Sequence, residues 1–180
     1  IQCCLVGSEM CIRDSSNYYD TLLTHSFGNY RDLLRAVTLH PAMGFYLSHV
    51  NNAKTDEDAN TFPDENYARE VMQLFTIGLY ELNSDGTRKL DAGGQPIPTY
   101  DNTDIREFSR IFTGLAYAGD AGQEPQFGRN RPVLHLPMVM FDNYHESGEK
   151  YLLNGFTVPD GQTGIQDIDD AVDNLFNHPN

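Results

Sequence analysis

The densest group of polar residues in the chain is the run Glu65-Asn66-Tyr67-Ala68-Arg69-Glu70. Apolar residues recur from Ala68 to Phe75 with the three- and four-residue spacing of one helix face, so this run opens a predicted helix. Glu65 and Arg69 are four residues apart in the order that favours an ion pair along a helix surface. Such pairs fix the packing of helices, and this structural role is the interpretation that the spacing favours.

A catalytic interpretation of the same run needs partners from elsewhere in the chain. Arg69 and Glu70 could reach acidic and basic residues of the next predicted helix, namely Arg106, Glu107 and Arg110. A buried network of that kind is expensive to assemble and would therefore indicate function. The candidate catalytic residues are accordingly Glu70, Arg110 and, from a later segment, His145.

His145 and Glu146 follow Asp142 closely, which gives three possible metal ligands within five residues. A metal site needs converging ligands with supporting hydrogen bonds, and neighbouring His and Glu side chains tend to diverge. The sequence thus predicts no metal site, and His145 and Glu146 remain its only candidate ligands. No cofactor is identified, since the chain has none of the Walker, Gly-x-Gly-x-x-Gly, Gly-x-Ser-x-Gly or His-Glu-x-x-His patterns.

The remaining histidines are predicted to be structural or exposed. His40 and His178 each precede a proline at the end of a predicted helix, where an imidazole can cap free backbone carbonyls. His25 and His49 lie on polar faces of predicted helices, so we expect both to be exposed. His135 lies in an irregular region of the kind that supplies binding loops.

Composition limits the classes of partner. The chain of 180 residues carries 26 Asp and Glu against 12 Lys and Arg, a net charge of −14. Such a surface repels phosphate backbones, so we expect no nucleic-acid partner. No run of about 18 apolar residues occurs, so no transmembrane segment is predicted.

Residues 1–15 differ from the rest of the chain. They contain all three cysteines, and their sequence looks like a translated sequencing adapter of the kind found at the ends of metagenomic reading frames. A signal-peptide remnant and a metal or redox cluster are the alternatives. We therefore expect a non-native segment at 1–15 and a partial helical domain at 16–180.

The predicted elements are mainly helices. Helices are expected at 17–25, across 29–51 as two helices joined at His40-Pro41, at 64–78, at 101–114 and at 165–176. Residues 51–63 are predicted to be a polar loop, and 81–100 a long loop or small hairpin. Short strands are predicted within 133–141 and 151–158. The fold class is therefore mainly α, a multi-helix domain with a small irregular or β insertion, truncated at both ends.

Several of these motifs together resemble the bacterial DUF1800 family of unknown function. The resemblance runs from Asn17 to Asn180 and is carried by the stretch from Glu65 to Gly78, by Asp104-Ile105-Arg106-Glu107, and by Arg110 to Gly114. His145, Gly148 and Lys150 resemble a further segment of the family. The motif residues matched are Glu65, Asn66, Tyr67, Arg69, Glu70, Thr113, Gly114, Gly148 and Lys150.

The chain departs from the family pattern at Leu115, Glu146 and Asn154, and its insert from Asn83 to Pro98 is longer than usual. The resemblance implies a mostly helical fold and a periplasmic or secreted location. It implies no established catalytic residues.

Two functions stay open from the sequence. The first is a binding or structural protein of the bacterial envelope with a protein partner there, in which the Arg and Glu residues organise helix packing. The second is an enzyme, a metal-assisted hydrolase using Glu70 and His145. Clustering of Glu70, Arg110 and His145 around one pocket would favour the enzyme.

Overall fold

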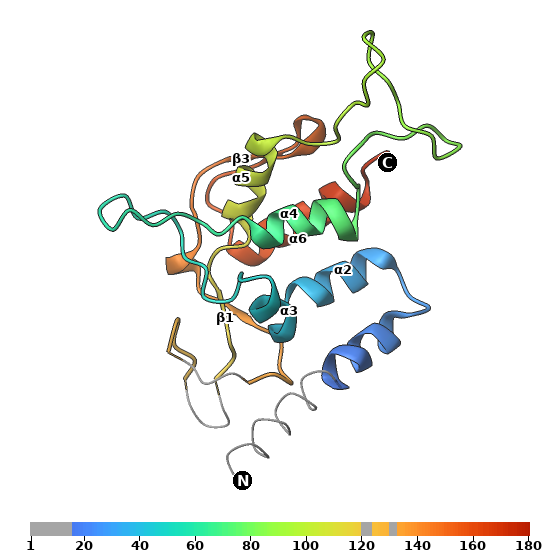
Figure 1. Cartoon of the computed structure of the whole chain (residues 1–180). Helices are drawn as coiled ribbons and strands as arrows, with labels where there is room; N and C mark the ends of the chain where they lie inside the picture. The colour runs from blue at the N-terminus through green and yellow to red at the C-terminus, as the bar shows by residue number, and fades with distance from the viewer. Residues whose placement is uncertain (1–15, 120–123, 130–132) are drawn as a thin grey trace, which may run out of the picture.

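The computed structural model describes residues 16–119, 124–129 and 133–180, and the predicted non-native segment 1–15 lies outside them. The chain is mainly α, as predicted (Figure 1). A helix at 16–25 is followed by α2 (Tyr30–Thr38), α3 (Pro41–Tyr46), α4 (Asn66–Glu70), α5 (Asn102–Ile111) and α6 (Gly164–Phe176). None of the described helices is long and apolar enough to cross a membrane.

Side-chain caps set where these helices begin. The Asn29 side chain accepts from the backbone N–H of Arg31 at the start of α2. Asp101 and Asp104 form a reciprocal capping box at the start of α5, as their spacing predicts. His40 does cap a helix, but it accepts from the N–H of Ala42 at the start of α3 instead of binding carbonyls at the end of α2. His178 likewise accepts a backbone N–H, that of Asn180.

The helix predicted over 64–78 changes from an α-helix to a π-helix part-way along. After α4 the backbone widens into a π-helical turn, η1 (Val71–Phe75), which the periodicity of the sequence does not reveal. The Thr76 hydroxyl donates to the carbonyl of Val71 at 2.6 Å, and the Tyr30 hydroxyl donates to that of Phe75. Gly78, with φ of +72°, then ends the helical stretch as predicted.

The core lies between α2, α4, α5 and α6, with α6 packed against both α2 and α5. Its largest fully buried apolar side chains include Tyr67, Met72, Phe108, Phe112 and Ile168. At its edge, Arg31 and Arg35 of α2 form ion pairs with Asp173 and Asp169 of α6. These contacts fix the direction of α6, which carries part of the candidate site.

Two small antiparallel ladders and two short 3₁₀ turns make up the region after α5. Strand β1 (Leu115–Ala116) pairs with β2 (Val139–Met140), and β3 (Lys150–Tyr151) pairs with β4 (Thr157–Val158). The turns are η2 (Asp142–Tyr144) and η3 (Leu153–Gly155). The strand predicted over 151–158 is interrupted at Asn154 and Gly155, which both have positive φ, so this segment folds back as a hairpin.

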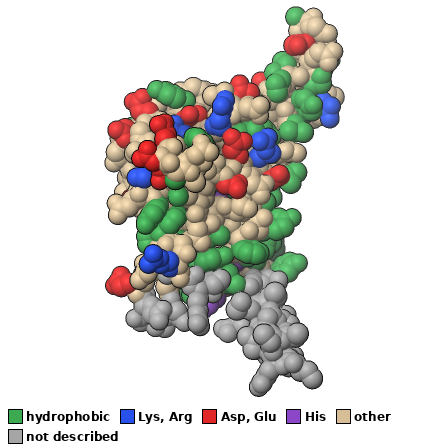
Figure 2. Space-filling model, turned by 60° about the vertical axis from the view of Figure 1, so that its left-hand side comes forward, with side chains coloured by type: hydrophobic (Ala, Val, Ile, Leu, Met, Phe, Trp, Pro, Cys, Tyr) green, Lys and Arg blue, Asp and Glu red, His purple; other side chains and the backbone are tan. Residues whose placement is uncertain are grey.

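The insert predicted as a loop or hairpin is a branched arm, residues 79–99, that projects from the helices (Figure 1). Isolated bridges join Tyr80 to Pro98 at its base, Leu82 to Arg88 in one branch and Leu90 to Pro96 in the other. On the face drawn in Figure 2, hydrophobic side chains gather on the arm and along the lower part of the body, and acidic side chains gather in the upper part of the body.

The prediction that His49 is exposed is wrong. Helix α3 ends at Tyr46, five residues before the predicted end at 51, and Ser48 adopts a positive φ of 64°. The chain therefore turns inward, and His49 is fully buried with its ring stacked on Tyr67 at a centroid distance of 3.9 Å. His25 is half-buried.

Candidate functional site

The Asp167 carboxylate lies at the centre of a buried polar cluster. Its Oδ2 accepts from the Lys150 ammonium at 2.7 Å and lies 3.0 Å from Nε2 of His145. Its Oδ1 accepts from the Gln162 amide at 3.1 Å. His145, Lys150 and Asp167 are each at most 5% exposed. One residue of α6 thus gathers three side chains from the segment that precedes it.

Charge and hydrogen bonding explain why this carboxylate tolerates burial. Burial alone would raise the pKa of Asp167, because it removes water from the charged form. The hydrogen bonds from His145, Lys150 and Gln162 outweigh that effect and lower the pKa of Asp167 below its usual value. The carboxylate is therefore ionised and paired, and the Lys150 ammonium has a compensating negative charge beside it.

The other nitrogen of His145 also has protein partners. Nδ1 lies 3.0 Å from the Thr113 carbonyl and 3.3 Å from the Thr113 hydroxyl. The order hydroxyl, imidazole, carboxylate is that of a nucleophilic triad. However, the Thr113 hydroxyl donates to the Arg110 carbonyl at 2.7 Å, and the residue is fully buried. A hydroxyl held in this way is not presented to a substrate.

Glycines allow the backbone to close around His145. Gly114 has a φ of +85°, and a Cβ there would lie 2.9 Å from the Phe141 carbonyl oxygen. At Gly164 a Cβ would lie 2.9 Å from Cγ of His145 and 2.6 Å from the Met140 sulfur. Gly148, also with positive φ, accepts from Lys150 through its carbonyl and donates its N–H to Asp160. Of the two motif glycines, Gly114 therefore serves close packing, and Gly148 supplies a positive φ.

Arg110 fastens the same segment from outside the cluster. Its guanidinium donates to the carbonyls of Ser147 at 3.1 Å and Glu149 at 3.0 Å, and it pairs with Glu107 on its own helix at 2.7 Å. Arg110 thus holds the backbone that carries Lys150, and does not point at a reacting group.

A cavity of about 80 Å³ adjoins the cluster. It is lined by Asp142, His145, Glu146, Ser147, Gly148, Lys150, Pro159, Asp160, Gly161, Gln162 and Asp167. Small-molecule sites usually have volumes of roughly 300–1,000 Å³, so this space suits a few waters. Neither Glu70 nor Arg110 lines it, so the three candidate catalytic residues do not share this cavity.

The two candidate metal ligands have their donor atoms engaged. Both nitrogens of His145 face protein oxygens, and the Glu146 carboxylate accepts from the Thr55 N–H at 2.7 Å. Within the described residues, no group of three or more His, Cys, Asp or Glu side chains is arranged to hold a metal ion.

In the Glu65–Glu70 run the predicted ion pair is present, with Arg69 3.2 Å from Glu65. Tyr67 is buried, its hydroxyl is 2.8 Å from that of Thr38, and burial raises the pKa of Tyr67. Asn66 is exposed. Glu70 is half-buried and forms no hydrogen bond or ion pair within the described part of the chain.

The network from α4 to α5 that would have indicated a catalytic role is not formed among these residues. Arg69 pairs within α4, and Arg106 and Arg110 bind groups of α5 or of the segment around Ser147. Each arginine finds an acceptor one helical turn away or on a neighbouring loop, which is nearer than the facing helix.

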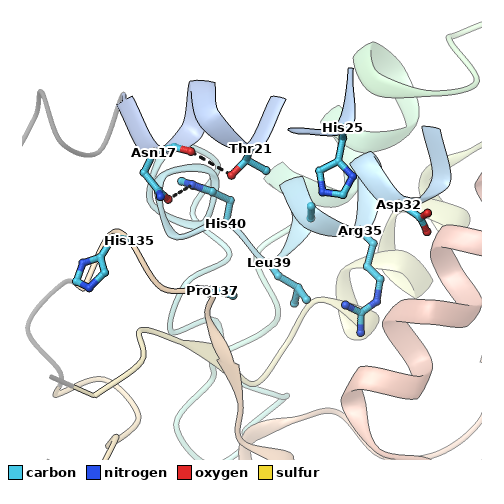
Figure 3. A pocket seen from close by; sticks show the side chains of 10 residues that line it. Asn17, Thr21, His25, Asp32, Arg35, Leu39, His40, His135 and Pro137 are labelled. Carbon is cyan, nitrogen blue, oxygen red and sulfur yellow. Dashed lines mark hydrogen bonds between the residues drawn. The ribbon is translucent and has the colours of Figure 1, made fainter. Parts of the chain in front are cut away.

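A larger groove of about 490 Å³ lies between the helix at 16–25 and α2 (Figure 3). Its lining includes Asn17, Thr21 and His25 from one helix and Arg35 from the other. In Figure 3 the Arg35 guanidinium points toward α6, where it pairs with Asp169, and the His135 ring points away from the groove. The other polar side chains of its lining are those of Asn17, Thr21, His25, Asp32 and His40.

Sequence reasoning missed Asp167, the residue that organises the cluster. A signal was present, because Asp167, Ala171 and Leu175 are spaced four residues apart, and all three are buried.

Comparison with known proteins gives one result. The family model described as "Protein of unknown function (DUF1800)" matches residues 5–180. No curated protein and no solved structure matches the chain. The matched range covers nearly the whole sequence, including the Glu65–Gly78 stretch and the His145–Lys150 segment, so the chain belongs to the DUF1800 family.

Proposed function

We propose that this chain is a binding or structural protein of the bacterial envelope, and that the family's polar residues hold its fold together. The observation that supports this role is that the cluster around Asp167 is buried and hydrogen-bonded internally. Each ionisable side chain in it is bound by protein groups and removed from water. The envelope location is the one that the family resemblance implies.

The alternative, a metal-assisted hydrolase using Glu70 and His145, has less support. It requires a pocket that the two residues share, with donor atoms free to bind a metal and a substrate. His145 has both ring nitrogens occupied, and Glu70 does not line the cavity beside it.

Metal content tests the two proposals against each other. The protein, purified with added divalent metals and then dialysed, is analysed for bound metal beside two variants, His145→Gln and His135→Gln. His135 is exposed and serves as the control. We expect the same metal content in all three proteins. A stoichiometric metal that is lost only in a folded His145→Gln variant would replace our proposal with the hydrolase.

A further inference from the structure

We propose that an apolar groove over α2 is the docking site for an amphipathic helix of another protein, one whose polar face is basic. This inference rests on the proposed binding role and adds the surface and the kind of partner. The groove is separate from the cluster around Asp167.

The shape of the groove suits side chains from a helix. The helix at 16–25 and η1 both lie against α2, and a cavity of about 140 Å³ remains between them. It is lined by Tyr18, Leu22, Tyr30, Leu33, Leu34, Val37 and Phe75. This volume is below that of usual small-molecule sites, and it suits a few apolar side chains.

Large apolar side chains stand uncovered beside the groove. Tyr19 and Leu23, one turn apart and each next to a groove residue, are 69% and 72% exposed. Leu74, the neighbour of Phe75, is 67% exposed, and Phe27, in the turn after the helix at 16–25, is fully exposed. Exposed apolar surface marks interaction sites.

A helix fits this surface better than an extended strand. The surface is built from helices whose backbone groups are bonded within each helix, so it has no free strand edge for an added strand. The carbonyl of Phe75 is taken by the Tyr30 hydroxyl. Binding must therefore come from apolar side chains, and helix surfaces present these in rows one turn apart.

The negative charge of this chain indicates that the partner's surface is positively charged. Asp20 lies one turn before Leu23, and Glu70 lies one turn before Leu74. Neither carboxylate forms a hydrogen bond or ion pair within the described residues. The whole chain carries −14, which disfavours a second copy and favours a basic partner.

Peptide binding to the full chain tests the proposal. The probe is a fluorescent peptide of about 18 residues, roughly five helical turns, with Leu and Lys arranged as an amphipathic helix. Two further peptides are compared with it, one that has Glu in place of every Lys and one in which the order of Leu and Lys is scrambled. We expect anisotropy to report binding of the patterned basic peptide alone.

Surface variants locate the binding. Leu23→Glu and Leu74→Glu should each weaken the affinity about tenfold or more, since each introduces a charge into the apolar contact. Leu90→Glu is the matched control, because Leu90 is 58% exposed on the arm. Asp20→Asn with Glu70→Gln should weaken binding at low salt more than at high salt.

Three results would overturn the proposal. The first is that the scrambled peptide binds as tightly as the patterned basic peptide. The second is that neither Leu23→Glu nor Leu74→Glu changes the affinity. The third is that the chain sediments as a dimer that Leu23→Glu dissociates, which would identify the occupant as a second copy. If the metal analysis turns out as expected and peptide binding fails, only the docking site is refuted.

Discussion

At the scale of single residues, burial of the Lys150 ammonium explains the arrangement around it. A buried charge is costly unless it is paired and its hydrogen bonds are satisfied. Lys150 is 2% exposed and donates to Asp167 and to the Gly148 carbonyl. His145 and Gln162 complete the bonding of Asp167, so the cluster is satisfied only as a unit.

His49 gives a pH dependence that can be measured. Full burial lowers the pKa of His49 from 6.5 to about 4, and its Nε2 donates to the Thr38 carbonyl in the neutral form. Below pH 6.5 the unfolded chain gains a proton that the folded chain cannot accept until about pH 4. The free energy of unfolding should therefore fall by about 3 kcal/mol across this interval.

Urea unfolding at several pH values between these limits checks this expectation. His49→Gln should remove that part of the pH dependence, whatever it does to stability at neutral pH. His25→Gln, at a half-buried histidine, should leave the dependence as it is. Identical pH profiles for the native protein and His49→Gln would contradict the account.

Among single residues, local pairs were predictable and distant ones were not. The Glu65–Arg69 pair follows from a spacing of four along one helix. The contacts of Asp167 with Lys150 and His145 span 17 and 22 residues, and no local periodicity encodes them. His49 was misassigned because the end of α3 was set too late.

At the scale of elements, capping residues and terminal glycines predicted most helix limits. Asn29, Asp101 and Gly78 act as their residue types suggest. The π-helical turn after Glu70 was not predictable, because it depends on the hydroxyls of Tyr30 and Thr76 reaching particular carbonyls. Strand β1 was missed because two residues are too few to show a pattern.

Side-chain hydrogen bonds anchor the base of the arm at 79–99, and one of them runs from the Thr99 hydroxyl to the Gly78 carbonyl. The Asn180 amide accepts from the Leu82 N–H and donates to the carbonyls of Ile77 and Tyr80. Asn180→Ala should therefore raise hydrogen exchange at the Leu82 amide about tenfold, with little change in the melting temperature.

Asn177→Ala is the control for this change, since in the described part of the chain the Asn177 side chain bonds only to the Asp173 carbonyl of its own helix turn. Exchange at Leu82 that stays as slow in Asn180→Ala as in the native chain would show that other contacts hold the arm.

At the scale of the whole molecule, α6 joins the two halves of the described chain. On one side it pairs with α2 through Asp169 and Asp173, and on the other it holds the segment from His145 to Gln162 through Asp167. The mainly α class was predictable from periodicity. The central place of α6 was not, because it depends on which distant segments pack against its two faces.

The central claim is that the cluster around Asp167 is part of the scaffold. The most direct test measures the free energy of unfolding in urea at neutral pH. The variants to compare with the native protein are Asp167→Asn and the double variant Asp167→Asn/Lys150→Met. Asp170→Asn is the control. Among the described residues, the Asp170 carboxylate accepts a hydrogen bond from Gln162 alone.

We expect Asp167→Asn to cost about 3–5 kcal/mol, because it leaves the Lys150 ammonium buried and unpaired, and the double variant to recover much of that loss. Asp170→Asn should cost less than about 1 kcal/mol. An Asp167→Asn variant as stable as the native protein, or more stable, would contradict the claim and indicate a cluster kept for function at the expense of stability.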